Sequence, residues 1–96
     1  MEIKFDDRAL EALYSEGSGR LARKFPPQVI RAFFRVMTVV KAVGSAQELH
    51  RFRGLDYHSL AGKRSGQKSL RLNDQFRLVV VEEGDVLNVI EIVDYH

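Results

Sequence analysis

The chain carries a carboxylic acid, a phenol and an imidazole in direct succession, at Asp94, Tyr95 and His96. A second imidazole, His58, stands where the helical pattern of the chain gives way to a strand pattern, and a run of cations follows it. These cations are Lys63, Arg64, Lys68, Arg71 and Arg77. Groups that donate and accept protons beside a cluster of cations are suited to proton transfer next to a phosphate. The combination favours RNA cleavage over other reactions.

Each of these groups also has an ordinary structural interpretation. The last three residues are typical of a frayed polar tail, His58 of a loop histidine bonded to backbone, and the cations of a solvated strand face. Arg71 and Arg77 flank one predicted turn, and we expect them to be neighbours across a hairpin. Adjacent guanidinium groups repel each other, so an anion between them would relieve the pair.

Other kinds of site leave no pattern in this sequence. There is no glycine-rich phosphate loop, no Ser-His-Asp arrangement with a nucleophile elbow, and no metal-ligand spacing among the three histidines. We therefore expect neither a metal nor another cofactor. Cysteine is absent, and we find neither a signal peptide nor an apolar run of about 20 residues. The sequence thus predicts a cytoplasmic protein with no membrane partner.

Charge is strongly segregated along the chain, although the formal net charge is only +2. Residues 20–41 carry six basic residues and no acid, and residues 51–77 carry seven basic residues against Asp56 and Asp74. Residues 78–96 carry five acids and no Lys or Arg. Phosphate contacts depend on local rather than total charge. The segregation favours a polyanionic partner, against the alternative that these charges only solvate the surface.

The N-terminal half has the spacing of helices. Apolar periodicity predicts a short strand at residues 3–5, helices over about 7–15, 21–25 and 27–43, and a short helix after the capping-box pattern of residues 45–48. Asp6 or Asp7 is the expected cap of the first helix. Pro27 fits the first turn of the longest helix, and Gly44 is its expected C-cap.

From Leu55 the apolar period changes to two. Strand patterns over residues 70–72, 76–81 and 86–95 are joined by turn residues at 73–75 and 83–85, which predicts an antiparallel meander. The expected fold class is α+β, with N-terminal helices packed on one face of an antiparallel β-sheet, in one domain of residues 1–96. If the pleat of the last strand is regular, Asp94 and His96 share one face and Tyr95 points to the other.

Two blocks of the sequence resemble a known family. Residues 60–78 match the pattern Leu-x-Gly-x-Arg-x-Gly-x-x-Ser-hydrophobic-Arg-hydrophobic-Asn-x-x-aromatic-Arg, and residues 89–96 end in its Asp-Tyr-His. The pattern is filled by Leu60, Gly62, Arg64, Gly66, Ser69, Arg71, Asn73, Phe76 and Arg77. Together the blocks resemble the HigB toxins of bacterial toxin–antitoxin modules, in the RelE/ParE superfamily. A RelE-like fold is expected from this resemblance.

The resemblance implies a metal-independent endoribonuclease that cuts mRNA on the translating ribosome, by attack of a 2′-hydroxyl on the adjacent phosphate. Carried over by position, the implied catalytic residues are His58, Arg77, Asp94, Tyr95 and His96. The cations expected to bind RNA are Lys63, Arg64, Lys68 and Arg71. A lysine that some members hold beside the first glycine is Ala61 here. Either Lys63 replaces it, or the departure implies weak activity.

The resemblance also implies a partner, a helix-turn-helix antitoxin of the HigA kind. Such an antitoxin would hold the toxin and repress the operon, so that the toxin would meet operator DNA only through it. Two alternatives stay open. One is a ParE-like inhibitor of DNA gyrase, a group whose chains lack the terminal Asp-Tyr-His. The other is a non-catalytic module that binds nucleic acid or an antitoxin.

Overall fold

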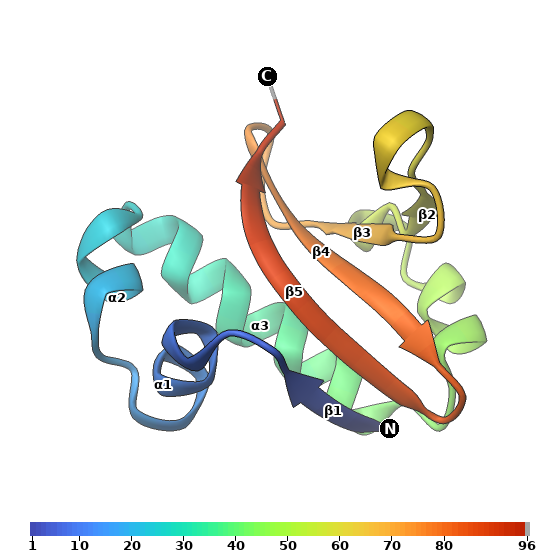
Figure 1. Cartoon of the computed structure of the whole chain (residues 1–96), viewed down its shortest axis with the longest axis horizontal. Helices are drawn as coiled ribbons and strands as arrows, with labels where there is room; N and C mark the ends of the chain where they lie inside the picture. The colour runs from blue at the N-terminus through green and yellow to red at the C-terminus, as the bar shows by residue number, and fades with distance from the viewer. Residues whose placement is uncertain (96) are drawn as a thin grey trace.

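In the computed structural model, which describes residues 1–95, a helical N-terminal half is followed by a meander of strands (Figure 1). The helices are α1 (Arg8–Glu16), α2 (Arg20–Lys24) and α3 (Pro27–Ala42), and the short 3-10 helices are η1 (Ala46–Arg51), η2 (Arg53–Leu55) and η3 (Gly62–Arg64). The strands are β1 (Glu2–Phe5), β2 (His58–Ser59), β3 (Lys68–Arg71), β4 (Phe76–Glu83) and β5 (Val86–Asp94). Each element predicted from the sequence is present.

The helix ends follow local sequence signals, with one exception. Asp7 caps α1, because its carboxylate accepts the backbone N–H of Ala9 at 2.6 Å. Pro27 opens α3, as expected. The predicted C-cap at Gly44 is wrong, since α3 ends at Ala42 and Val43 leaves the helix in an extended conformation. Val43 is buried there, so hydrophobic burial outweighs the usual left-handed glycine cap.

The segment after α3 is fixed by the predicted capping box. The Glu48 carboxylate accepts the backbone N–H groups of Ser45 at 3.0 Å and Gly44 at 2.7 Å. This fixes the start of η1, which buries Leu49 and leads the chain towards η2 and β2. This path positions β2, which carries His58, one of the residues expected at the site.

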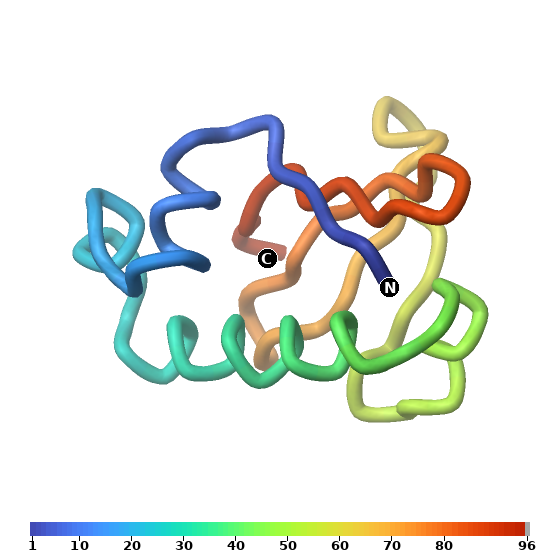
Figure 2. The backbone as a smooth tube through the Cα atoms, turned by 90° about the horizontal axis from the view of Figure 1, so that it is seen from below, coloured from blue at the N-terminus to red at the C-terminus, as the bar shows by residue number. Residues whose placement is uncertain are grey.

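The core lies between the helices and one face of the sheet. Figure 2 shows α3 running along one side of the strands, with α1 and α2 near one end of it. The buried residues of α3 recur at helical spacing, and they are Val29, Ala32, Phe33, Val36, Met37 and Val40. The sheet contributes Leu70, Leu78, Val80, Leu87 and Val89 to the same cluster. None of the helices in residues 1–95 has the length and apolar character needed to cross a membrane.

The sheet has the strand order β1-β5-β4-β3-β2. Strands β3 to β5 form the predicted antiparallel meander, and the short strand β2, which was not predicted, extends it by pairing with β3. The α+β class with helices on one face of the sheet is therefore confirmed, but the sheet is mixed, because β1 pairs with β5 in parallel from Glu2 opposite Val86 to Phe5 opposite Val89. Parallel neighbours need a long connection between them, and here that connection is the rest of the domain.

A β-bulge interrupts β5. Val79 of β4 lies opposite Glu91, but the next residue, Val80, lies opposite Val89, so that Ile90 is the extra residue. The bulge exchanges the two faces of β5. Before it, Val89 points into the core, whereas after it Val93 lies opposite Arg77 on the other face. The regular pleat assumed from the sequence is therefore wrong for this strand, because the residues after Ile90 lie on the faces opposite to those that an unbroken alternation from Val89 would give them.

Candidate active site

The side chain of Arg77 is the centre of the site. It projects from β4 on the sheet face away from the helices, and the residue is only 6% exposed. Its Nε donates to Ser69 Oγ at 2.7 Å, and its Nη1 donates to Asp56 Oδ2 at 3.2 Å. Its Nη2 donates to the backbone carbonyls of Asp56 and Ser69. Arg77 is therefore a fixed, hydrogen-bonded cation rather than part of a solvated strand face.

Asp56 and Ser69 were not among the predicted site residues. Asp56 sits at the end of η2 in the left-handed region, with φ of 45°, a conformation that Asp adopts more readily than most residues. Its side chain is 61% exposed. Ser69 is fully buried on β3. The sequence signal for Asp56 was that it is an isolated acid within a basic stretch. Ser69 is recognised from the strand pairing, in which it lies opposite Val79, two residues from Arg77.

His58 lies beside the guanidinium group. Its Nδ1 is 3.4 Å from Nη2 of Arg77, 2.9 Å from the carbonyl oxygen of Asp56 and 3.6 Å from Asp56 Oδ1. β2 pairs His58 with Ser69, so the same short hairpin positions the imidazole and the serine that holds Arg77. The side chain is 40% exposed, which leaves the imidazole accessible for proton transfer.

Tyr95 joins this group from the end of β5. The Arg77 guanidinium lies over the Tyr95 ring, 5.4 Å from its centroid, and the phenol-bearing residue is 54% exposed. The backbone N–H of Tyr95 donates to the carbonyl of Gln75 at 2.7 Å. Tyr95 therefore faces Arg77, because the bulge at Ile90 turns Val93 and Tyr95 away from the core face that Leu87 and Val89 occupy.

Asp94 lies opposite Phe76 in the register, one position beyond the pair of Val93 and Arg77. Its carboxylate accepts the side-chain amide of Gln75 at 3.0 Å. The expectation that Asp94 and His96 share a face falls on His96, which lies outside the described residues. The roles expected of Asp94 and His96 stay predictions.

The predicted RNA-binding cations separate into two groups. Arg64 is on the same face as Arg77, because it pairs with Glu91 at 2.8 Å and contacts Gln67 at 2.9 Å. Lys63 is exposed beside it in η3. Lys68 lies on the other face, where its ammonium is 2.7 Å from Glu82 and 5.3 Å from the centre of the Tyr57 ring. Geometry brings Lys63 and Arg64, but not Lys68, towards the site.

Arg71 and Arg77 are register partners across β3 and β4, as expected. Each guanidinium forms an ion pair with an acid of the chain itself, Arg71 with Asp74 and Arg77 with Asp56. The repulsion between the two cations is thus relieved within the chain. Among residues 1–95, no three His, Asp or Glu side chains gather so that they could hold a metal ion.

A second polar cluster fixes the segment that carries His58. The buried Tyr57 donates its hydroxyl to Glu82 at 2.6 Å, and Lys68 completes the group. Burial, and then the bond to Glu82, raises the pKa of Tyr57 above its ordinary value. The bond from Lys68, and then that from Tyr57, lowers the pKa of Glu82. These contacts tie the residue before His58 to β3 and β4.

Solved structures of bacterial proteins share this fold, and one of them is a YoeB/ParE toxin. The structure of YafQ from E. coli strain BL21(DE3) aligns with a TM-score of 0.62 and 9% identity, over 98% of this chain and 92% of that chain. The YoeB/ParE toxin from Agrobacterium tumefaciens aligns with a TM-score of 0.59 and 14% identity, over 100% of both chains. These identities are low, so the likeness shows a shared fold.

The sequence comparisons define the family. The model of the HigB-like toxin, described as the RelE-like toxin of the type II toxin–antitoxin system HigB, matches residues 3–96. Toxin HigB-1 of Vibrio cholerae serotype O1 is 29% identical over 79 residues, which cover 82% of this chain and 81% of that protein. Since the family model spans nearly the whole chain, this protein belongs to the HigB-like family of RelE-like toxins.

The burial of Arg77 predicts a structural cost for its removal. Arg77→Ala leaves the Ser69 hydroxyl and two backbone carbonyls without their donor, so we expect the free energy of unfolding to fall by about 2–4 kcal/mol. Ser69→Ala, which removes one hydrogen bond, should cost about 1 kcal/mol. Urea denaturation measures both, with the exposed Arg53→Ala as a control. Unchanged stability of the Arg77→Ala chain would show that the guanidinium does not hold residues 56–58.

The Glu82 cluster predicts a pH dependence of stability. Because the folded-state pKa of Glu82 is lowered, its contribution is complete above the ordinary carboxyl pKa and is lost as the pH falls through the lowered value. The stability lost in Glu82→Gln should therefore be largest at neutral pH and shrink towards about pH 3. Asp85→Asn, at an exposed turn, is the control. A constant difference between wild type and Glu82→Gln across this range would contradict the account.

Proposed function

We propose that this protein is a ribosome-dependent mRNA endonuclease, acting without a metal through attack of a 2′-hydroxyl on the adjacent phosphate. The observation that carries the proposal is the convergence of an imidazole, a buried guanidinium and a phenol: His58 and Tyr95 both lie against Arg77. That set supplies proton transfer and a fixed positive charge in one place. Membership of the HigB-like family supports the role of a toxin, of which this activity is the form proposed here.

Arg77 is suited to stabilise the charge that builds up on the phosphate in the transition state. Its bonds to Ser69 and to two carbonyls fix its orientation before RNA binds, and a preorganised donor needs no rearrangement during the reaction. The Asp56 carboxylate is the exposed partner of the guanidinium. We propose that the substrate phosphate takes the position of this carboxylate when RNA binds.

Proton transfer falls to His58, Asp94, Tyr95 and His96 in this proposal. His58 is the imidazole nearest the Arg77 guanidinium among the described residues, and histidine is the side chain that most often serves as a general acid or base. The exposed ring of Tyr95 contacts the same guanidinium and carries the phenol group. Arg64, Lys63 and Arg71 are proposed to bind the flanking phosphates, and Lys68 is assigned a weaker part because Glu82 holds it on the other face.

The partner proposed for the toxin is a helix-turn-helix antitoxin of the HigA kind, through which the pair would bind operator DNA in the cytoplasm. The type II family of this chain supports an antitoxin partner. So do the YoeB–YefM complexes from Staphylococcus aureus, one of which aligns with a TM-score of 0.57 over 100% of this chain.

Removal of the His58 imidazole should abolish activity. His58→Gln is expected to lower the rate of mRNA cleavage on ribosomes by about 100-fold or more, the usual contribution of a positioned acid or base. His50→Gln is the matched control, because that imidazole packs against the Tyr57 ring, whereas His58 contacts Arg77. In cells without antitoxin, the unchanged chain should stop protein synthesis before DNA synthesis. Failure of replication first, with intact mRNA, would favour gyrase inhibition.

The role of His96 is tested by removing that residue alone. A chain that ends at Tyr95 keeps the core, the bulge and the contact between Tyr95 and Arg77. Its melting temperature should be unchanged, and its cleavage of ribosome-bound mRNA should fall by about 100-fold. Equal cleavage by the two chains would remove His96 from the mechanism and assign proton transfer to His58, Asp94 and Tyr95.

A further inference from the structure

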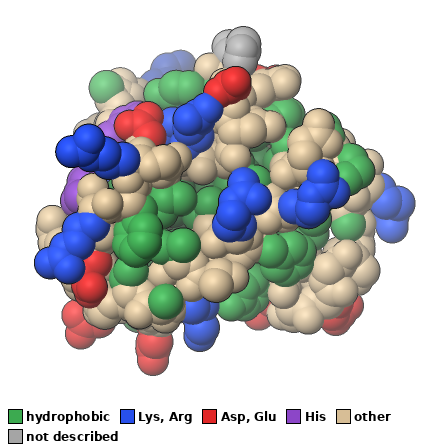
Figure 3. All heavy atoms as spheres, turned by 180° about the vertical axis from the view of Figure 1, so that it is seen from behind, with side chains coloured by type: hydrophobic (Ala, Val, Ile, Leu, Met, Phe, Trp, Pro, Cys, Tyr) green, Lys and Arg blue, Asp and Glu red, His purple; other side chains and the backbone are tan. Residues whose placement is uncertain are grey.

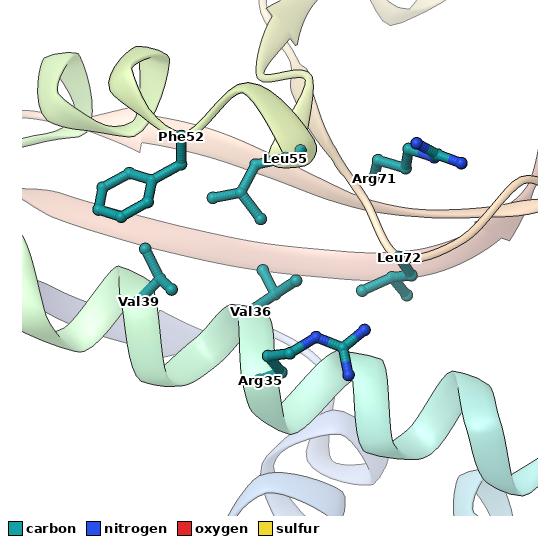
Figure 4. Close-up of a pocket in the computed structure, with 8 residues that line it drawn as sticks. Arg35, Val36, Val39, Phe52, Leu55, Arg71 and Leu72 are labelled. Carbon is teal, nitrogen blue, oxygen red and sulfur yellow. The ribbon is translucent and has the colours of Figure 1, made fainter.

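An apolar groove lies between α3 and the η2 segment, on the face seen in Figure 3. It encloses about 340 Å³ and is lined by Arg35, Val36, Val39, Phe52, Gly54, Leu55, Arg71 and Leu72. In the close-up of Figure 4, Phe52 and Leu55 point from the η segment towards Val39 and Val36 of α3. Phe52 is 43% exposed, although its ring is large and apolar. The volume is at the lower end of the range for ligand sites, about 300–1,000 Å³.

The charged residues of the groove have one sign. Arg35 and Arg71 lie at the same end of it, on either side of Leu72 (Figure 4). The Arg35 side chain makes no hydrogen bond or ion pair with any residue from 1 to 95, and Arg71 is bonded at the exposed surface by Asp74 and by the backbone carbonyl of Asn73. Residues 17–47 and 49–55, which supply α3 and the Phe52 wall, contain no acid. Figure 3 shows hydrophobic side chains on this face with Lys and Arg among them, and Asp and Glu towards its edges.

We propose that this groove binds an acidic amphipathic segment of the antitoxin protein. Apolar side chains of that segment would fill the space between Val36, Val39 and Leu55, with Phe52 as the aromatic anchor. Carboxylates of the same segment would pair with Arg35 and Arg71. An amphipathic segment laid in an apolar groove is a recurrent mode of peptide recognition, and charge complementarity at the rim determines which segment binds. The inference rests on the antitoxin partner proposed above.

The apolar floor favours a protein segment over RNA. A nucleotide would bring phosphates to an apolar surface that offers cations only at one end, whereas an amphipathic peptide matches both parts. The position of the groove also links binding to activity. Arg71, at its rim, is the register partner of Arg77, so a carboxylate on Arg71 would compete with RNA for that cation.

The test uses the full chain and the purified antitoxin, with affinity measured by calorimetry. Phe52→Ala and Arg35→Glu should each weaken binding at least about tenfold, whereas Arg35→Lys should retain most of the affinity. Arg23→Glu, an exposed charge reversal on α2 away from the groove, is the matched control and should bind normally. The loss in Arg35→Glu should be greatest at low salt, because the rim contact is exposed. Neither Phe52 nor Arg35 belongs to the proposed RNA site, so mRNA cleavage by these variants should be unchanged.

The outcomes separate this inference from the proposed function. If both groove variants bind the antitoxin with an affinity within twofold of that of the wild type, the proposed role of the groove is overturned. If the groove variants lose mRNA cleavage but keep the antitoxin affinity, the groove binds RNA. If the unchanged chain is a dimer and the groove variants are monomers, the groove binds a second copy of the chain. Either result overturns the proposal. Absence of antitoxin binding by the unchanged chain would overturn the proposed partner itself. If the variants bind the antitoxin more weakly, but even the unchanged chain does not cleave mRNA, the groove proposal holds and the nuclease proposal is rejected.

Discussion

Arg77 holds a positive charge at a nearly buried position of the sheet, and the arrangement of the site follows from how that charge is compensated. A buried ion without partners costs several kcal/mol of folding free energy. The Arg77 guanidinium therefore needs hydrogen-bond and ion-pair partners around it. Ser69 and the backbone of β3 bond it from one side, and Asp56 bonds it from another. The loop between η2 and β2 is thereby brought to the sheet. His58 reaches the guanidinium because it follows Asp56 by two residues and pairs with Ser69.

The bulge at Ile90 supplies the third side of the site. One extra residue in β5 lets the strand present Leu87 and Val89 to the core and still present Val93 and Tyr95 to the face that carries Arg77. The fold thus separates its two faces by function: apolar packing against α3 on one, and polar groups on the other. The antitoxin groove proposed here lies at the border between them, where Leu72 belongs to the core and Arg71 to the polar face.

The sequence was sufficient to predict features that depend on neighbours along the chain. Helical spacing located α3, the capping box located η1, and alternation with turn residues located the β3–β5 meander. Features that depend on distant contacts were missed. The parallel pairing of β1 requires the whole domain to be placed, the bulge is set by packing of both faces of β5, and the burial of Arg77 depends on Asp56, 21 residues away. The resemblance supplied His58, Arg77 and Tyr95 as candidates, whereas the structure supplied their geometry and added Asp56 and Ser69.

The most direct test of the central claim is the chemistry of the RNA ends. Attack of a 2′-hydroxyl on the adjacent phosphate releases a 5′-hydroxyl and leaves a 2′,3′-cyclic phosphate, which requires proton transfer and a fixed cation but no metal. Ribosomes programmed with mRNA would first be treated to replace exchangeable metal to the extent that they stay intact. Purified protein would then be added, and mass spectrometry would identify the ends of the cleaved fragments. The account predicts cyclic phosphate and 5′-hydroxyl ends, produced by the wild type and absent with His58→Gln. Fragments with 5′-phosphate and 3′-hydroxyl ends, or intact mRNA with the wild-type protein, would contradict it.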